Sequence, residues 1–184
     1  MSQPGIPDPL PLDGPLWTFA LAVYTSDGVS DALIALQDHF EADVNLLLFG
    51  AWLGVERGII LTNSDAEQAR NLIAAWNDEV VRPLRALRRK LKIWPAPALG
   101  GAVTSLRGQI KAAELHSERL ELAWLEHYAA AWNGTSGIGT ADAVMRNLGT
   151  ILALTAGNAR LASASRHLGI ISGAACRPSS LQPG

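Results

Sequence analysis

The chain has few of the residues that cross-link or anchor a protein. Among its 184 residues there is a single cysteine, Cys176, which excludes an internal disulfide framework and a metal site built from several cysteines. The N-terminal stretch MSQPGIPDPLPLDGP has neither a basic region nor an apolar core, so we expect no signal peptide. The longest apolar run, Val44 to Val55, is shorter than the roughly 20 residues that a membrane-spanning helix needs. These absences predict a cytoplasmic protein without a membrane span.

Strand-like alternation of apolar and polar residues is also missing, and so is any internal repeat. Apolar residues instead recur every three or four positions, which predicts an all-α protein: a compact bundle of about five to seven helices. We expect a flexible N-terminal arm at 1–14, a single domain at 15–172 and a flexible C-terminal tail at 173–184. The run Val44 to Val55 is apolar on nearly every side, so it predicts a helix buried at the centre of the bundle.

Local signals predict where several helices begin and end. Asp13 and Asp43 are placed to cap helices, and Ser64 with Glu67 has the spacing of a capping box. Pro83 predicts a kink or break near positions 81–82, because proline cannot donate a backbone hydrogen bond. Two long helices, about 64–92 and 104–132, flank the loop WPAPALGG and predict a long antiparallel hairpin in the middle of the chain.

Charge is nearly balanced overall, with 15 basic and 17 acidic residues and a formal net charge of −2. This balance gives no general attraction to nucleic acid, which is therefore a disfavoured partner. The distribution is uneven, because residues 1–60 hold eight acids and one base, while residues 61–133 hold eight acids and ten bases.

Most of these bases lie in the run RPLRALRRKLK, which begins at Arg82. One interpretation is a surface that binds a protein partner with an acidic surface. The alternative is ion pairing within the hairpin, where Arg82 and Arg85 would approach Glu114 and Glu118, with Glu121 one turn further on. The residues that would bind the partner are Arg82, Arg85, Arg88, Arg89 and Lys92.

An acidic cluster at Asp38, Glu41 and Asp43 lies beside His39. No glutamate in the chain is followed three residues later by histidine, so the pattern of a helical di-iron site is missing and we expect no metal or other cofactor. Polar groups at the mouth of a buried helix either fix the link between two helices or line a small pocket. The pocket interpretation places there Gln37, Asp38, Asp43, Asn45 and Trp52.

Three segments together resemble a family of short proteobacterial proteins known as a conserved domain of unknown function. They are LWTFALAVYTSDGVSDALIALQDHFEADVNLLLFGAWLG, then W...VVRPLRALRRKLK, then KAAELHSERLELAWLEHY. The resemblance covers about Trp17 to Tyr128, and its core motif is LQD...DVNLLLF..WLG. It implies a cytoplasmic all-α protein and supplies no catalytic residues.

Two functions remain open on this basis. The first is a non-enzymatic binding or adaptor protein that uses the basic helix, and a homo-oligomer is compatible with it. The second is a small-ligand-binding or enzymatic helical domain with an apolar cavity walled by Phe49, Trp52 and Trp76. The helical isoprenoid synthases are an analogy of architecture only, since their paired aspartate-rich motifs are missing.

Overall fold

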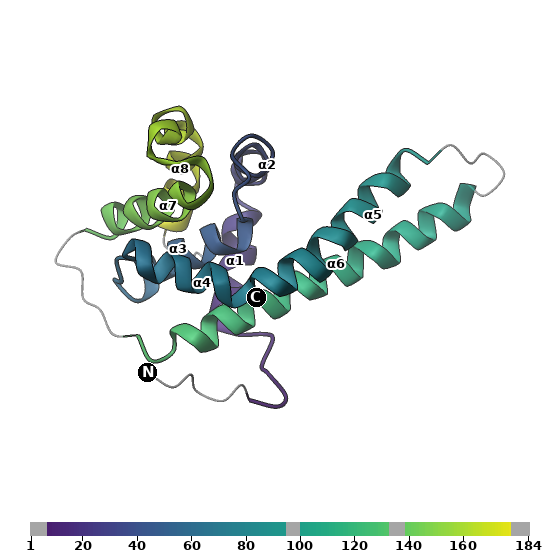
Figure 1. Ribbon diagram of the computed structural model, residues 1–184, viewed down its shortest axis with the longest axis horizontal. Coiled ribbons are helices and arrows are strands. Elements are labelled where there is room, and N and C mark those ends of the chain that lie inside the picture. The colour runs from purple at the N-terminus through teal and green to yellow at the C-terminus, as the bar shows by residue number, and fades with distance from the viewer. Residues whose placement is uncertain (1–6, 95–99, 133–138, 178–184) are drawn as a thin grey trace.

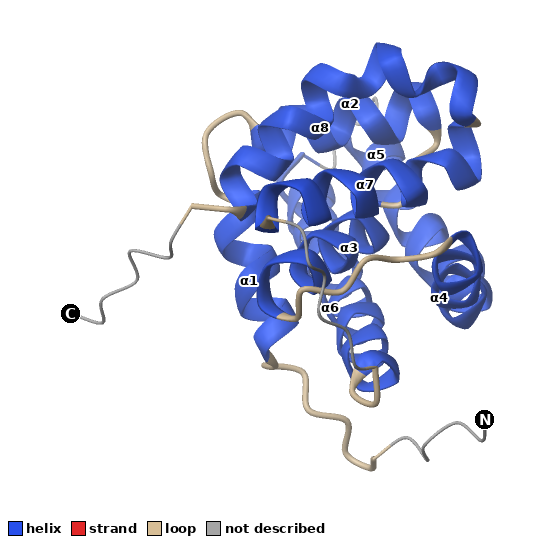
Figure 2. Cartoon of the chain, turned by 90° about the vertical axis from the view of Figure 1, so that its left-hand side faces the viewer, coloured by secondary structure: helices blue, strands red, loops and turns tan. Residues whose placement is uncertain are grey.

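The computed structural model describes residues 7–94, 100–132 and 139–177, and every regular element within them is helical (Figure 2). Because α4, η1 and α5 follow one another without a break, these residues form seven helical rods, which confirms the all-α prediction. The elements are α1 (Pro15–Tyr24), α2 (Val29–Phe40), α3 (Val44–Glu56), α4 (Asn63–Trp76), the π-helix η1 (Asn77–Val81), α5 (Arg82–Lys92), α6 (Gly100–Ala129), α7 (Thr140–Ala156), the 3₁₀ turn η3 (Asn158–Arg160) and α8 (Leu161–Ala175).

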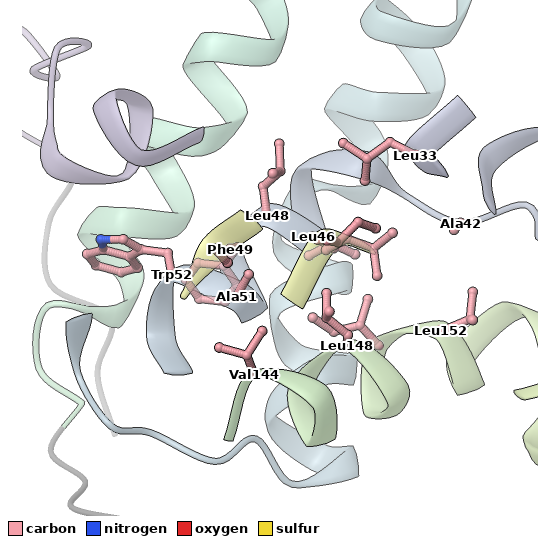
Figure 3. Packing of buried hydrophobic residues seen from close by; sticks show 14 of the residues in the cluster. Leu33, Ala42, Leu46, Leu48, Phe49, Ala51, Trp52, Val144, Leu148 and Leu152 are labelled. Atoms are coloured by element: carbon pink, nitrogen blue, oxygen red, sulfur yellow. The ribbon is translucent and has the colours of Figure 1, made fainter. Parts of the chain in front are cut away.

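The central helix is α3, in which every residue from 45 to 54 is buried. Figure 3 shows Leu46 and Phe49 packed near Val144 and Leu148 of α7. The two helices approach closely at Gly54, where an added Cβ would lie 2.9 Å from the backbone nitrogen of Val144. The apolar run read from the sequence is therefore the core helix of the bundle.

One buried amide fixes the path from α3 to α4. Asn147 of α7 is fully buried, and its Nδ2 donates to the carbonyls of Gly50 at 2.9 Å and Ile59 at 2.8 Å. Its Oδ1 accepts from the backbone N–H of Leu61 at 2.8 Å. Both N–H groups and the oxygen of the amide are thus in use, so a polar side chain is held in the core without an unmet hydrogen bond.

The capping signals were partly right. Asp43 caps α3, because its Oδ1 accepts from the backbone N–H of Leu46 at 3.1 Å. Asp13 does not cap α1. That helix begins after Gly14, and the carboxylate that meets its first turn belongs to Glu126, which accepts from the backbone N–H of Leu16 at 2.7 Å. A distant residue thus takes the place of the local cap.

The capping box of α4 lies two residues before the predicted one. Thr62 and Asp65 form it, rather than Ser64 and Glu67, with a backbone N–H bonded to each side chain. The stretch TNSDAEQ contains both spacings, and the earlier one forms because the helix begins at Asn63. At the start of α5, Pro83 does not break the continuous helix that α4, η1 and α5 form. The wider π-helical turn at 77–81 precedes it and accommodates the missing donor.

The predicted hairpin is formed by α5 and α6, which run side by side away from the other helices (Figure 1). With 30 residues, α6 is about 45 Å long at 1.5 Å per residue. Its C-terminal half packs into the body, whereas α5 has no buried residue. The hairpin therefore joins the body at one end and is exposed along the rest of its described length.

Two further observations concern the chain as a whole. The predicted start of the tail, at residue 173, falls inside α8, which continues to Ala175 with buried alanines at 174 and 175. Among the described residues, no single helix has both the length and the hydropathy to cross a membrane. Only α1 and α2 taken together reach them, and a 97° bend separates the two.

Candidate functional site

A polar cavity of about 310 Å³ lies where α2 ends, α3 begins and α5 passes alongside. Four of the five predicted pocket residues line it, and three of the five predicted basic residues line it as well. The two sets therefore belong to one place, although about 40 residues separate them in the sequence. The shared lining residues are Gln37, Asp38, Asp43, Asn45, Arg82, Arg85 and Arg89.

The remaining predicted residues lie elsewhere. Trp52 does not line the cavity; it is 4% exposed in the core and stacks on Phe49, with ring centroids 6.3 Å apart. Trp76 packs beside α6, where its Nε1 donates to the carbonyl of Ser117 at 3.1 Å. These aromatic rings line neither this cavity nor a second one, of about 220 Å³, between α3, α4 and α7. Arg88 and Lys92 also lie outside the polar cavity.

Two arginines of α5 bind acids of α6, and one of them, Arg85, also reaches Gln37 of α2. Arg85 donates to Gln37 Oε1 at 2.6 Å and to Glu114 at 3.2 Å, and it also pairs with Glu118. Arg88 forms a two-pronged pair with Glu114, a residue that is only 5% exposed. The internal pairing that the sequence left open is therefore formed by these two arginines.

The other two arginines that line the cavity are less constrained. Arg89 meets Asp38 at 3.3 Å, and both side chains are about half exposed. Arg82 does not reach the acids of α6. It pairs instead with Asp78, one turn earlier on the same helical path, at 3.1 Å. Exposed pairs of this kind contribute only about 0–1 kcal/mol, so these two side chains can exchange partners at little cost.

Three carboxyl groups behind the cavity have raised pKa values, because burial disfavours their ionised forms. Burial raises the pKa of Glu121 to about 8, and the neighbouring Asp43 carboxylate adds to the shift. Burial likewise raises the pKa of Asp43 and of Glu118, although both also accept hydrogen bonds. Asn45 donates to Glu121 Oε2 at 2.6 Å. At neutral pH, Glu121 is therefore largely a neutral acid at the base of the hairpin.

Glu114 behaves in the opposite way. Burial opposes its ionisation, but the hydrogen bonds and charges of Arg88 and Arg85 outweigh burial and lower its pKa. The base of the hairpin thus contains both kinds of buried carboxyl group, one ionised against arginines and one neutral against an asparagine.

The link between α2 and α3 contains a strained residue. Glu41 has φ of +56°, a conformation that normally favours glycine, and the N–H of Ala42 bonds back to the carbonyl of Leu36 at 3.3 Å. This is the usual glycine-type end of a helix, built here with glutamate. The side chain of Glu41 lines both cavities and is exposed.

The exposed end of the hairpin has a different composition. We define the hairpin end as residues 87–94 and 100–111. From residue 80 to residue 113 the sequence contains no acid. Large apolar side chains at the hairpin end are between 42% and 80% exposed: Leu87, Ile93, Trp94 and Leu106. The bases between 80 and 113 are Arg82, Arg85, Arg88, Arg89, Lys90, Lys92, Arg107 and Lys111.

Four of these bases, Lys90, Lys92, Arg107 and Lys111, form no ion pair within the described part of the chain. Arg107 is the most unusual of them, because its Nε is buried yet has no hydrogen-bond partner there. A buried donor without an acceptor is unfavourable. The hairpin end therefore has unmet positive charge beside exposed apolar surface, which is suited to an acidic, partly apolar partner.

Arg107 and Lys111 were not among the residues predicted from the sequence, because they lie outside the dense run of bases that precedes the loop. The signal that could have found them is the complete lack of acid between residues 80 and 113. Asn77 was not predicted either, and its Nδ2 donates to Asp43 Oδ2 at 2.9 Å across the cavity wall. No group of three or more His, Cys, Asp or Glu side chains in the described ranges is placed to hold a metal ion.

Comparison with known proteins adds one match. No curated protein and no solved structure shows a significant match to the chain. A family model described as "Protein of unknown function (DUF2390)" matches residues 15–125, which span α1 to most of α6 and include both the cavity and the hairpin. The chain therefore belongs to the DUF2390 family.

Proposed function

We propose that this chain is a non-enzymatic binding protein whose hairpin end docks onto a protein partner with an acidic surface. The observation that supports it is the joint presence of unpaired bases and exposed apolar side chains on a helical hairpin outside the body. Interfaces between proteins bury an apolar centre inside a polar rim, and charge complementarity sets partner choice.

The structure changes which bases we assign to this role. Arg85 and Arg88 are committed to buried acids of α6, so they hold the hairpin in shape. The residues available to a partner are Lys90 and Lys92 in the last turn of α5, and Arg107 and Lys111 on α6. Arg82 and Arg89 can contribute at the base of the hairpin, since their present pairs are exposed.

A protein partner fits better than nucleic acid for two reasons. Phosphate contacts need cations but gain nothing from Leu87 or Leu106, two of the apolar side chains that are exposed at the hairpin end. The rest of the chain holds all 17 acids, which repel a polyanion that extends beyond the hairpin end. The cytoplasmic location and the proteobacterial origin stay predictions.

The polar cavity favours a second candidate, a small-ligand-binding protein. Its walls offer guanidinium groups from α5 and carboxylates from the link between α2 and α3. The isoprenoid analogy depended on an apolar cavity walled by Phe49, Trp52 and Trp76, and none of these residues lines the polar cavity. A thermal-shift screen of charged metabolites, with Mg²⁺ and prenyl diphosphates included, tests it. A shift that Arg82→Ala and Asp38→Ala both abolish would support it.

The experiment for the main proposal is site-specific photo-crosslinking in cells of the source organism. A photo-reactive amino acid replaces Leu106 at the hairpin end, and in a control chain it replaces the exposed Ser163 of α8. We expect adducts at Leu106 whose cross-linked peptides, identified by mass spectrometry, come from an acidic protein surface.

A charge comparison completes the test. Lys92→Glu with Lys111→Glu should abolish those adducts. Arg146→Glu with Arg166→Glu changes the net charge equally at exposed positions of α7 and α8 and should leave them unchanged. The proposal is wrong if the adducts are mainly RNA or lipid, or if they persist in the variant that carries Lys92→Glu and Lys111→Glu.

A further inference from the structure

A second surface of this chain has the properties that the hairpin end requires of a partner. Residues 1–56 contain eight acids and no lysine or arginine. Within them, α1 and α2 leave three large apolar side chains exposed, Leu21 at 43%, Tyr24 at 41% and Ile34 at 46%. These are the largest apolar exposures among the described residues outside the hairpin. Acidic and apolar surface therefore occur together here, as basic and apolar surface do on the hairpin.

Helical spacing places these groups on common faces. On α2, Asp31, Ile34 and Asp38 recur at intervals of three and four, so they lie along one face. On α1, Leu21 and Tyr24 are three residues apart and lie on one face as well. We call Leu21, Tyr24, Asp27, Asp31 and Ile34 the acidic patch.

The hairpin end has the matching arrangement. Leu87 and Lys90 are three residues apart and share one side of α5. Trp94 lies two residues beyond the end of this helix, and the Lys90 ammonium lies over its ring, 5.7 Å from the centroid. On the antiparallel helix, Leu106 is 46% exposed and Arg107 follows it. Apolar side chains and cations therefore occur together at the hairpin end, as apolar side chains and carboxylates do at the acidic patch.

Contact between these two kinds of surface already occurs once within the chain. Arg89 of α5 meets Asp38 at the end of α2 at 3.3 Å, close to the base of the hairpin. Further out, the hairpin extends away from the body (Figure 1), and neither Asp27 nor Asp31 forms an ion pair within the described ranges. Among the described residues, charge partners are therefore missing for Asp27 and Asp31 in the acidic patch and for four cations of the hairpin end, Lys90, Lys92, Arg107 and Lys111.

We propose that a second copy of this chain supplies the missing partner, so that the hairpin end of each copy lies on the acidic patch of the other. The proposal rests on the proposed function, because it uses the same hairpin end and names what binds there. A two-fold axis makes both contacts equivalent and closes the assembly as a dimer. Pairing of two hairpin ends is disfavoured, because it would bring cations against cations.

Charge exchange tests the arrangement on the full-length chain. Variant H carries Lys92→Glu and Lys111→Glu, and variant P carries Asp27→Lys and Asp31→Lys. We expect the wild type to sediment as a dimer in analytical ultracentrifugation. Each variant alone should dimerise at least about a hundredfold more weakly, because like charges then face each other in both contacts.

An equimolar mixture of H and P should recover the dimer as a one-to-one heterodimer, since both of its contacts again join opposite charges. Arg146→Glu with Arg166→Glu serves as the matched control and should remain dimeric. Far-ultraviolet circular dichroism of each variant verifies that the helices are intact.

The outcomes separate this inference from the proposed function. A wild type that is monomeric at every accessible concentration overturns the dimer, and so does a dimer that survives in P or a mixture that stays monomeric. In those cases, adducts at Leu106 that come from the acidic surface of a different protein would still support the proposed function. If the adducts are the acidic patch of the chain itself, both proposals hold.

Discussion

Glu121 makes the stability of this protein fall as pH rises, and Glu121→Gln should remove most of that dependence. The side chain is 1% exposed, and burial raises its pKa from 4.5 to about 8. The unfolded chain therefore releases this proton near pH 4.5, whereas the native protein keeps it until about pH 8. Between these values the unfolded state binds fewer protons, so the free energy of unfolding decreases with increasing pH.

The size of the effect follows from the shift. Each pKa unit corresponds to about 1.4 kcal/mol, so a difference of roughly three units or more amounts to about 3–5 kcal/mol lost between pH 4.5 and 8. Glutamine has the shape of the neutral acid and can still accept from Asn45. We therefore expect the two proteins to differ little near pH 4.5, and the variant to be more stable by several kcal/mol above pH 8.

Urea unfolding monitored by circular dichroism, at steps from about pH 5 to about pH 8.5, gives the free energy at each pH. Glu67→Gln, at an exposed position of α4, is the matched control and should keep the wild-type dependence. Asp43 and Glu118 add a decline of the same sign, so the difference between wild type and variant is the decisive quantity. If that difference is the same at pH 5 and pH 8.5, Glu121 is not a buried neutral acid.

The remaining predictions concern packing, charge and strain. Arg85→Met should cost about 1.5–3 kcal/mol, since it leaves Glu118 unpaired and removes one of the two arginines that bind the buried Glu114, whereas Arg82→Met should cost less than about 1 kcal/mol. Glu41→Gly should stabilise the protein by about 0.5–1 kcal/mol, because glycine adopts the positive φ without strain. Gly54→Ala should destabilise by about 1–3 kcal/mol, because its Cβ would meet backbone atoms, while Gly149→Ala, with open space around it, should stabilise by about 0.5–1 kcal/mol.

Urea unfolding at neutral pH measures all of these changes. Equal costs for the two arginine variants would contradict the division between buried and exposed ion pairs. A loss of stability in Glu41→Gly would show that the glutamate side chain contributes more than its backbone conformation costs. A tolerated alanine at position 54 would mean that α3 and α7 can separate without loss.

The sequence predicted the parts of the fold that depend on local periodicity. The core helix was predictable because a helix that is apolar on every side is stable in this bundle only when the other helices bury it. The ion pairs of Arg85 with Glu114 and Glu118 followed from the register of an antiparallel hairpin. Asn147 was not predictable, because its three hydrogen bonds reach residues between 86 and 97 positions away that no spacing rule connects.

The candidate site shows the same division. Gln37, Asp38, Asp43 and Asn45 are close in sequence around a helix start, so their grouping was predictable. Trp52 was wrongly added to them, because nine residues of helix carry it about 13 Å along the axis from Asp43. The arginines of α5 reach this cavity through side-chain contacts with α2, Arg85 with Gln37 and Arg89 with Asp38, and nothing in either segment alone indicates those contacts.

The position of Glu114, the acid of α6 that lies nearest to the hairpin end, links the fold to the proposed function. Moving from the body towards the hairpin end, Glu114 is the final carboxylate of α6, and it already binds Arg85 and Arg88. Further out, Arg89 pairs with Asp38. The remaining cations, Lys90, Lys92, Arg107 and Lys111, form no ion pair among the described residues and must remain in water or bind a carboxylate on another molecule. Solvated lysines alone would be unremarkable, since exposed charges cost little. The argument for a partner therefore depends on Leu87, Trp94 and Leu106, which are exposed beside those cations. Their burial against a partner would remove apolar surface from water and so stabilise the complex.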